Sequence, residues 1–294
     1  MSTQMPAFSR LIRFLGRDNR IYYGDALLPP GVNDVAAATR ARIIDGDIFA
    51  QHCVSDSAVE IRRLLPPLAP SHVGTVRCLG LNYADHARET GMPRPKFPVL
   101  FYKPATALNG PKDPIPVPPM AQETVGLDYE CELVVVIGKR CTNVTQQDAL
   151  NCVLGYSVGN DFSHRDWQLH RGGGQWSLGK SFDGWAPFGP AIVSTDLIPD
   201  PQKLKIWTKV NGETLQNGTT ADMIFGVRET VAFLSQGVTL MPGDVIFTGT
   251  PAGVGLGRSP PLSLKNGDVV EVGLERVGTC TNKVEFETKS SARL

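Results

Sequence analysis

Two glutamates, Glu130 and Glu132, stand two residues apart where a strongly apolar run begins. Residues two apart point to the same face of a β-strand, so the two carboxylates would share one face. Val134 and Val136 continue that face, and both faces of the predicted strand 130–137 are apolar beyond its start. Two ionised carboxylates in a buried region repel each other, and each is costly if unpaired, so we expect a positive charge between them.

Asp161 adds a third carboxylate at the end of the apolar run 153–162. Ligand sets made only of oxygen favour a hard cation, Mg²⁺, Mn²⁺ or Ca²⁺, over zinc. Three carboxylates would leave about three of six octahedral positions for water and substrate. A glutamate pair alone would also suit an exposed strand edge, but the apolar run and Asp161 favour a metal site formed by Glu130, Glu132 and Asp161.

His86 and Glu89 lie three residues apart in a short predicted helical stretch, residues 82–90. That spacing lets two side chains meet on a helix surface. A glutamate that orients a histidine and stabilises its charge makes the histidine a general base for water or for an enol proton. A solvated surface helix would show the same pattern, so the spacing alone leaves both interpretations open.

Other polar residues could bind an anionic substrate. Arg165 lies about one helical turn after Asp161, so both can face one site, and an arginine can hold a carboxylate with two N–H groups. Lys180 could neutralise an enolate or an oxyanion, although an ordinary surface lysine is the alternative. Thr250, in the glycine-rich segment 247–255, offers hydroxyl and N–H donors, unless that segment is simply a tight turn.

The segment Gly174–Ser181 matches G-x-x-x-x-G-K-[ST], the pattern of a nucleotide-binding P-loop. That site requires a buried strand before the pattern and a helix N-terminus after it. The preceding residues 165–171 form a polar, helical pattern, and the following residues 182–190 contain two prolines and cannot form a helix. We therefore reject an ATP-binding protein, which leaves Lys180 available for another role.

Short strands and turns dominate the expected secondary structure, as 30 glycines and 23 prolines suggest. Strands are expected at 11–15, from 21, and at 76–81, 99–102, 130–137, 153–158, 204–210, 245–248, 269–274 and 283–286. Helices are expected after Ser55 or Asp56 as far as Pro66-Pro67, and at 145–153, 163–171 and 226–236. Asn211-Gly212 predicts a hairpin turn. The expected fold class is mainly β (α+β).

A proline-containing connector, residues 68–74, divides the pattern into two parts. We expect a small N-terminal β-rich domain, residues 1–72, and a catalytic domain, residues 73–290. A length of 294 residues suits this division.

Charge and composition exclude several classes. Lys+Arg and Asp+Glu both number 29, so we expect no nucleic-acid or membrane partner. No apolar run reaches 18 residues, so no membrane span is expected, and six cysteines without a C-x-x-C pair are expected to be reduced and structural. Arginines in residues 1–17 resemble a mitochondrial presequence, but the pattern better suits a first strand, so we expect a cytoplasmic protein, with the mitochondrion as the alternative.

Six strings, in order and spacing from about residue 75 to 286, resemble the fumarylacetoacetate hydrolase family. They are Gly80–His86, Tyr129–Leu133, Asn160–Gln168, Gly179–Asp183, Pro242–Ile246 and Thr248–Pro251. The resemblance implies a mixed β-sandwich roll, a homodimer, and one Mg²⁺ or Mn²⁺ in each active site. It implies these metal ligands: Glu130, Glu132 and Asp161. It implies these catalytic residues, the first two on a lid segment: His86, Glu89 and Lys180. It implies these substrate-facing residues beside Lys180: Arg165, Gln168 and Thr250.

Further strings, including Trp167-Gln168 and Gln175-Trp176, look most like the subgroup that contains oxaloacetate keto–enol tautomerases. Relatives in the family cleave acylpyruvates or decarboxylate oxaloacetate, and all of them begin with the metal-stabilised enolate of a small 2-oxo acid. We therefore expect an oxaloacetate tautomerase, with an acylpyruvate-type C–C hydrolase or an oxaloacetate decarboxylase as the alternatives. A non-catalytic, metal-stabilised scaffold is the rival from another class, but it would have no need for His86, Glu89 and Lys180.

Overall fold

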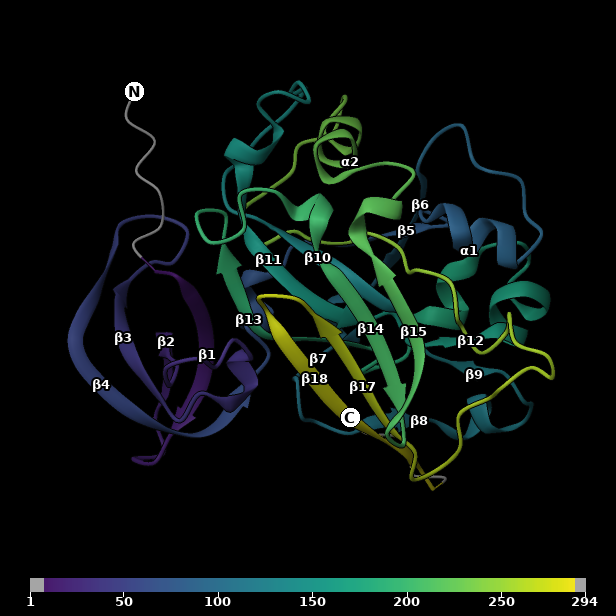
Figure 1. Ribbon diagram of the computed structural model, residues 1–294, viewed down its shortest axis with the longest axis horizontal. Coiled ribbons are helices and arrows are strands. Elements are labelled where there is room, and N and C mark those ends of the chain that lie inside the picture. Colours follow the sequence, from purple (N-terminus) through teal and green to yellow (C-terminus); the bar gives the residue numbers. More distant parts are fainter. Residues whose placement is uncertain (1–7, 289–294) are drawn as a thin grey trace.

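The computed structural model describes residues 8–288, and two β-sheets dominate it (Figure 1). The larger sheet has, in spatial order, β2 (Ile21–Leu27), β3 (Arg40–Gly46), β4 (His52–Leu65), β1 (Arg10–Gly16), β13 (Ala186–Ser194), β11 (Val153–Asn160), β10 (Cys131–Ile137), β16 (Val245–Phe247), β5 (Val76–Gly80) and β6 (Val99–Lys103), with β7 (Leu108–Asn109) beside β13. The smaller sheet has β15 (Glu213–Thr219), β14 (Lys205–Val210), β17 (Val269–Leu274), β18 (Gly278–Phe286) and β8 (Ile115–Val117). The short strands β12 (Ser163–His164) and β9 (Leu127–Asp128) form a separate pair.

Helices are short and lie around the sheets. Residues 8–288 contain two α-helices, α1 (Ala84–Glu89) and α2 (Val227–Leu234), and η6 (Trp167–Arg171) is a π-helix. The 3₁₀ turns are η1 (Val35–Ala37), η2 (Pro70–His72), η3 (Ala105–Ala107), η4 (Pro119–Gln122), η5 (Ala149–Cys152), η7 (Trp176–Lys180), η8 (Pro201–Lys203) and η9 (Thr220–Asp222). Within residues 8–288, no helix has the length and apolar character needed to cross a membrane.

The two sheets pack face to face over the strand that carries the glutamates. Strands β14, β17 and β18 of the smaller sheet lie against β10, β11 and β13 of the larger one. Every residue of β10 is buried, and alternate residues enter different cores. Leu133 and Val135 pack in the core between the sheets, whereas Val134 and Val136 pack on the opposite face. The mainly β sandwich and the two apolar faces of this strand are therefore confirmed.

Local signals predicted some elements well. Asn211 and Gly212 both have positive φ angles, 52° and 86°, and join β14 to β15 as the hairpin prediction required. Strand β1 pairs with β2, which confirms the expected first strand; residues 1–7 of the presequence-like segment lie outside the described residues. Strand β1 also pairs with β13, so the first four strands extend the larger sheet.

Three helix predictions were wrong or too long. The segment after Ser55 forms the 14-residue strand β4, because it pairs with both β1 and β3, and these tertiary contacts override its weak helical pattern. Only the 3₁₀ turn η5 forms within residues 145–153, and residues 163–171 begin as strand β12 before the π-helix. Strand β13 was not predicted, because Pro187 and Pro190 argued against regular structure there.

The candidate active site

Three carboxylates meet where β10 and β11 run side by side. Cys131 pairs with Asn160 in the antiparallel register, so the residues just outside that pair, Glu130 and Asp161, lie opposite each other. Glu132 points to the same face as Glu130, as the spacing predicted. Ligand atoms of Glu130, Glu132 and Asp161 all lie within 4.8 Å of one another, and all three residues are buried.

Asp161 lies between two fully buried lysines. Lys180 Nζ is 2.8 Å from Asp161 Oδ2, and Lys103 Nζ is 2.7 Å from Asp161 Oδ1. Lys103 donates its hydrogen bonds to the backbone carbonyls of Phe162, Lys180 and Trp185. An ammonium has only three N–H groups, so Lys103 supplies charge to Asp161 Oδ1 but has no hydrogen bond left for it. That oxygen keeps its lone pairs available for another partner.

Lys180 contacts two of the three carboxylates, Asp161 and Glu130. Its Nζ donates to Ser163 Oγ at 2.7 Å and lies 3.2 Å from Glu130 Oε1. Burial lowers the pKa of Lys180, but Asp161 and Glu130 more than compensate and raise it above its usual value. Lys180 is therefore a charged ammonium. The segments that flank the P-loop-like pattern are the π-helix η6 and, after Ser181, strand β13, so the rejection of a P-loop is confirmed.

Glu132 is the carboxylate whose burial is least compensated by hydrogen bonds and neighbouring positive charge. Its Oε2 accepts the N–H of Gly249 at 2.7 Å, whereas Oε1 has no hydrogen-bond partner, and the residue is 0% exposed. Burial, then Asp161 and Glu130, raise the pKa of Glu132 well above its usual range. Glu130 differs: burial raises its pKa, but Lys180 and Arg165 bring it below the usual value. A buried oxygen with no partner, facing two other carboxylates, is the feature a bound cation would satisfy.

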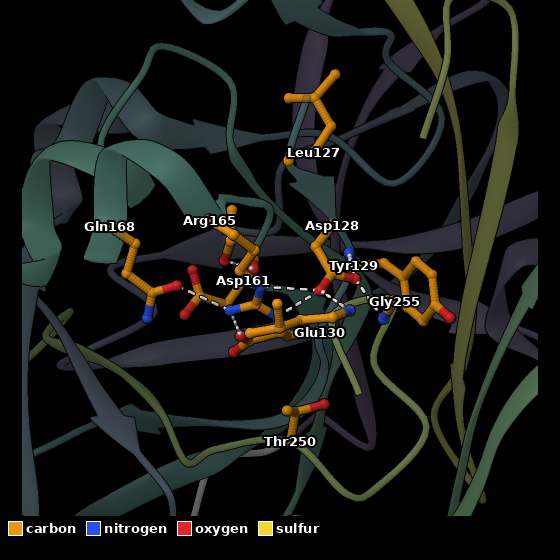
Figure 2. A network of polar contacts seen from close by, with 12 residues as sticks. Leu127, Asp128, Tyr129, Glu130, Asp161, Arg165, Gln168, Thr250 and Gly255 are labelled. Atoms are coloured by element: carbon orange, nitrogen blue, oxygen red, sulfur yellow. Dashed lines mark hydrogen bonds and ion pairs between the residues drawn. The ribbon is translucent and has the colours of Figure 1, made fainter. Parts of the chain in front are cut away.

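Arg165 is held by an aspartate that the sequence analysis did not identify. Figure 2 shows its guanidinium between Asp128 and Glu130, with Gln168 on the same side as Glu130. Nε donates to Asp128 Oδ2 at 2.8 Å, and Nη1 donates to Glu130 Oε1 at 2.6 Å and to Gln168 Oε1 at 2.9 Å. Three of the five N–H groups of Arg165 are thus used within the protein. Because Gln168 accepts through Oε1, its amide nitrogen is left as a donor.

His86 and Glu89 meet on α1, as their spacing predicted. His86 Nδ1 lies 3.3 Å from Glu89 Oε2, and the Glu89 carboxylate also accepts the N–H of Gly253 at 2.9 Å. Burial raises the pKa of Glu89, but the bonds from His86 and Gly253 lower it below its usual value overall. Glu89 is therefore ionised at neutral pH. It orients the His86 ring and ties α1 to the loop that follows β16.

Thr250 lies on that loop with its hydroxyl already engaged. Oγ1 donates to the Cys131 carbonyl at 2.9 Å and accepts from Gln216 Nε2 at 2.7 Å. The hydroxyl hydrogen is used, so the backbone N–H of Thr250 is the donor that remains for a ligand. Gly249 has a φ of +93°, a conformation that suits glycine and that here accompanies the bond from its N–H to Glu132.

A cavity of about 380 Å³ opens over these residues. Its polar lining comprises His86, Glu89, Thr90, Glu130, Arg165, Gln168, Lys180 and Thr250. Its other lining residues are Leu79, Gly80, Leu81, Met92, Phe101, Leu169, Trp176 and Leu256. Glu132 and Asp161 are fully buried and are not among the lining residues. The structure thus brings the predicted residues together from five separate stretches of sequence: seven of them line one cavity, and Glu132 and Asp161 lie next to Glu130 in the buried cluster beside it.

The buried charges favour a cation and an acidic ligand. When all four carboxyls (Asp128, Glu130, Glu132 and Asp161) are ionised, they face three cations (Lys103, Arg165 and Lys180), which leaves one excess negative charge. A divalent cation would turn this into one excess positive charge. The all-oxygen cluster and the unpartnered Glu132 oxygen fit a hard divalent cation.

Two charged residues of this site were missed, Asp128 and Lys103. Asp128 carried a signal, since Asp128, Glu130 and Glu132 alternate in sequence as residues on one strand face would. Lys103 follows four strand-forming residues and gave no local sign of burial. The six cysteines are all free, as expected, and five of them are buried.

Comparison with known proteins identifies the family of this chain. The family model described as fumarylacetoacetate (FAA) hydrolase C-terminal matches residues 75–285. Oxaloacetate tautomerase FAHD2A, mitochondrial, of Bos taurus is 48% identical over 225 residues, which cover 76% of this chain and 70% of that protein. A fumarylacetoacetate hydrolase domain-containing protein 2 homolog of Dictyostelium discoideum is also 48% identical, over 74% of this chain and 73% of that protein.

Solved structures show the same similarity along nearly the whole chain. A 2-hydroxyhepta-2,4-diene-1,7-dioate isomerase from Mycobacterium marinum has a TM-score of 0.80 and 35% identity, covering 96% of this chain and 100% of that one. A fumarylacetoacetate hydrolase from Exiguobacterium antarcticum has a TM-score of 0.74 and 35% identity, covering 95% of this chain and 100% of that one. This chain therefore belongs to the fumarylacetoacetate hydrolase family of enzymes.

Proposed function

We propose that this enzyme is an oxaloacetate keto–enol tautomerase that uses Mg²⁺ or Mn²⁺. The observation that carries the proposal is the cluster of Glu130, Glu132 and Asp161, within 4.8 Å of one another, beside the cavity that His86 and Lys180 line. Relatives named oxaloacetate tautomerase, 48% identical over most of this chain, support the choice of substrate.

The metal would be held by Glu130, Glu132 and Asp161. When bound, a hard divalent cation acts as a Lewis acid that polarises the 2-oxo group of the substrate. Lys103 and Lys180 hold Asp161 from both of its oxygens, and Gly249 holds Glu132. These contacts orient the ligands before any cation arrives, which lowers the cost of assembling the site.

Proton transfer is assigned to His86. Tautomerisation removes one proton from carbon 3 of the keto acid and adds one proton to the oxygen on carbon 2. His86 lines the cavity and has Nε2 available, because Nδ1 faces Glu89. Glu89 sets the orientation of the ring through its contact with Nδ1.

The remaining groups bind and stabilise the anion. Gln168 offers its amide nitrogen and Thr250 its backbone N–H, and both residues line the cavity. Arg165 orients Gln168 and adds positive charge beside the substrate. Lys180, a charged ammonium within the cavity, opposes the negative charge that develops on the enolate.

The test measures three reactions of the purified enzyme with Mg²⁺. Decay of enol-oxaloacetate is followed in the ultraviolet, pyruvate release from oxaloacetate measures decarboxylation, and pyruvate release from an acylpyruvate measures C–C hydrolysis. We expect tautomerisation to have the highest kcat/KM, because hydrolysis also needs a water placed about 3–3.5 Å from a second carbonyl carbon. A higher kcat/KM for acylpyruvate cleavage or decarboxylation would make that reaction the function. No turnover of any of them would favour a non-catalytic scaffold.

Assembly and organisation complete the proposal. We propose a homodimer, since Phe97 and Phe233 form an exposed aromatic stack, 6.4 Å between ring centroids, of a kind that interfaces cover. Light scattering of the full chain should give twice the 31.8 kDa monomer mass.

We place the domain boundary at residue 72, because the family match begins at residue 75.

The compartment is tested separately. The bovine relative is named as a mitochondrial protein, which fits the mitochondrial alternative, whereas the composition first suggested the cytoplasm. Fractionation of cells that express the full chain distinguishes the two, since only a mitochondrial protein is protected from added protease by intact organelles.

A further inference from the structure

We propose that Trp176 limits the size of the group that the substrate carries on carbon 3, so that the enzyme excludes 2-oxo acids with a bulky apolar group there. This inference rests on the proposed tautomerase function. Trp176 is the largest side chain of the cavity lining. The cavity, about 380 Å³, is near the lower end of the roughly 300–1,000 Å³ typical of small-molecule sites.

Trp176 is fixed in place by close contacts on one edge. A Cβ atom on Gly80, at the end of β5, would lie 2.1 Å from Cζ3 of the Trp176 indole. No side chain tolerates such a contact, so glycine at position 80 is what allows the indole to lie against the strand. Phe101 of β6 packs edge-on to the same indole, with 6.0 Å between the ring centroids and an angle of 65°.

The same short helix carries Trp176 at its start and Lys180 at its end. Gln175 caps η7 by accepting the N–H of Ser177 at 3.2 Å, and Lys180 is anchored by Asp161 and Ser163. Lys180 Nζ also lies 5.2 Å from the centre of the Phe101 ring. The indole is therefore held at a set distance from the carboxylate cluster by a rigid turn and two neighbouring strands.

The direction of the substrate follows from this arrangement. Oxaloacetate has a 2-oxo group and two carboxylates, one of them attached to carbon 3, and these polar groups belong at the polar side, with Gln168, Lys180 and Thr250. An additional apolar group on carbon 3 that extends away from them meets the apolar side, where Phe101 and Trp176 are the aromatic residues. The Lys180 ammonium packs against the face of the Phe101 ring, so replacing Phe101 would expose that ammonium. Trp176 is the aromatic residue that can be replaced without this effect.

The experiment compares two substrates, oxaloacetate and oxaloacetate with a benzyl group on carbon 3. Wild-type enzyme should tautomerise the first with much the higher kcat/KM. Trp176→Ala should raise kcat/KM for the benzyl compound, relative to kcat/KM for oxaloacetate, by about tenfold or more, which is the scale on which pocket size discriminates between substrates. Trp176→Phe should give a ratio between those of wild type and Trp176→Ala. Leu178→Ala is the matched control, because Leu178 lies on the same helix but is 44% exposed and is not part of the cavity lining.

A second measurement uses Gly80. Gly80→Ala should force the indole out of its position and impair turnover of oxaloacetate, whereas the same change should be tolerated in the Trp176→Ala background. An unchanged substrate ratio in Trp176→Ala, or an equal loss for both substrates, would overturn the size limit. Failure of wild-type enzyme to turn over oxaloacetate would instead overturn the proposed function, so the two failures are distinguishable.

Discussion

Asp128 and Arg165 form a buried ion pair, with Asp128 Oδ2 accepting from Arg165 Nε at 2.8 Å. The other oxygen of Asp128 accepts the N–H of Gly255 at 2.7 Å, and Oδ2 also accepts from Leu256 at 2.9 Å. Asp128 therefore links Arg165 to the loop that bears Thr250. This loop also holds the Glu89 carboxylate, so one aspartate connects Arg165 and Thr250 with the pair of His86 and Glu89.

Asp128→Asn should weaken both folding and substrate binding. The amide would leave the buried Arg165 guanidinium with only one of its two counter-charges, Glu130, and breaking a buried pair costs about 3–5 kcal/mol. We expect a lower Tm and a higher KM with a smaller change in kcat, because the guanidinium and Gln168 lose their fixed orientation. Asp166→Asn is the control, since Asp166 pairs with Arg171 and His170 near the surface and its replacement should leave the Tm and KM almost unchanged. Equal KM values for the two variants would contradict a positioning role for Asp128.

Metal removal should abolish activity and lower the Tm, because a cation that binds only the folded protein stabilises it.

Glu132→Gln should have opposite effects on the thermal stability of the metal-free and the metal-loaded protein. Without metal the variant should be more stable than wild type at neutral pH, on the order of 1 kcal/mol or about 2–4 °C in Tm. Burial and the two neighbouring carboxylates raise the pKa of Glu132, so folding of the metal-free wild type requires either uptake of a proton there or burial of a charge with an unpartnered oxygen, and the amide avoids both costs. With metal it should be less stable than loaded wild type.

Thermal unfolding with and without Mg²⁺ checks this crossover. Glu285→Gln, at an exposed position of β18, should behave as wild type in both conditions. A Glu132→Gln variant that gains as much Tm from Mg²⁺ as wild type does would exclude Glu132 as a ligand.

His86→Ala should lower kcat for tautomerisation by a factor of roughly 10²–10⁴, the usual contribution of a general base. Substrate binding should persist, because the other polar groups of the cavity, including Gln168, Lys180 and Thr250, are unchanged. Glu89→Gln should have a smaller effect, since an amide oxygen can still accept from Gly253. Steady-state kinetics measures both, with His170→Ala as the control for an exposed histidine, whose side chain is 73% exposed. Wild-type kcat in His86→Ala would reduce the pair to a structural contact.

Lys103→Met should destabilise the protein strongly. The change leaves Asp161 with a lone neighbouring lysine and three backbone carbonyls without their donor, so we expect a loss of about 3–5 kcal/mol. Chemical denaturation gives the value. Lys112→Met is the control, because Lys112 is exposed and the expected change is within about 0.5 kcal/mol. A stability equal to that of the Lys112 variant would show that Lys103 is dispensable for the fold.

Features that depend on local spacing could be predicted from the sequence. Period-two alternation placed Glu130 and Glu132 on one face of a buried strand, and helical spacing paired His86 with Glu89. The Asn211-Gly212 turn was also predictable, because few residue pairs adopt positive φ angles at both positions. Each of these signals lies within a few residues of chain, where backbone geometry alone decides which side chains are neighbours.

Which distant residues complete the site became known from the folded structure, because it depends on contacts between remote parts of the chain. Lys103 reaches Asp161 from 58 positions away in the numbering, and Asp128 reaches Arg165 across 37. It also decided that β4 is a strand, since β1 and β3 supply its hydrogen-bond partners on both sides. Contacts of this kind follow from sheet register and packing, which depend on interactions among residues throughout the chain. A lone lysine after an apolar strand, or a weak helical pattern, carries no local trace of the partner that will determine its role.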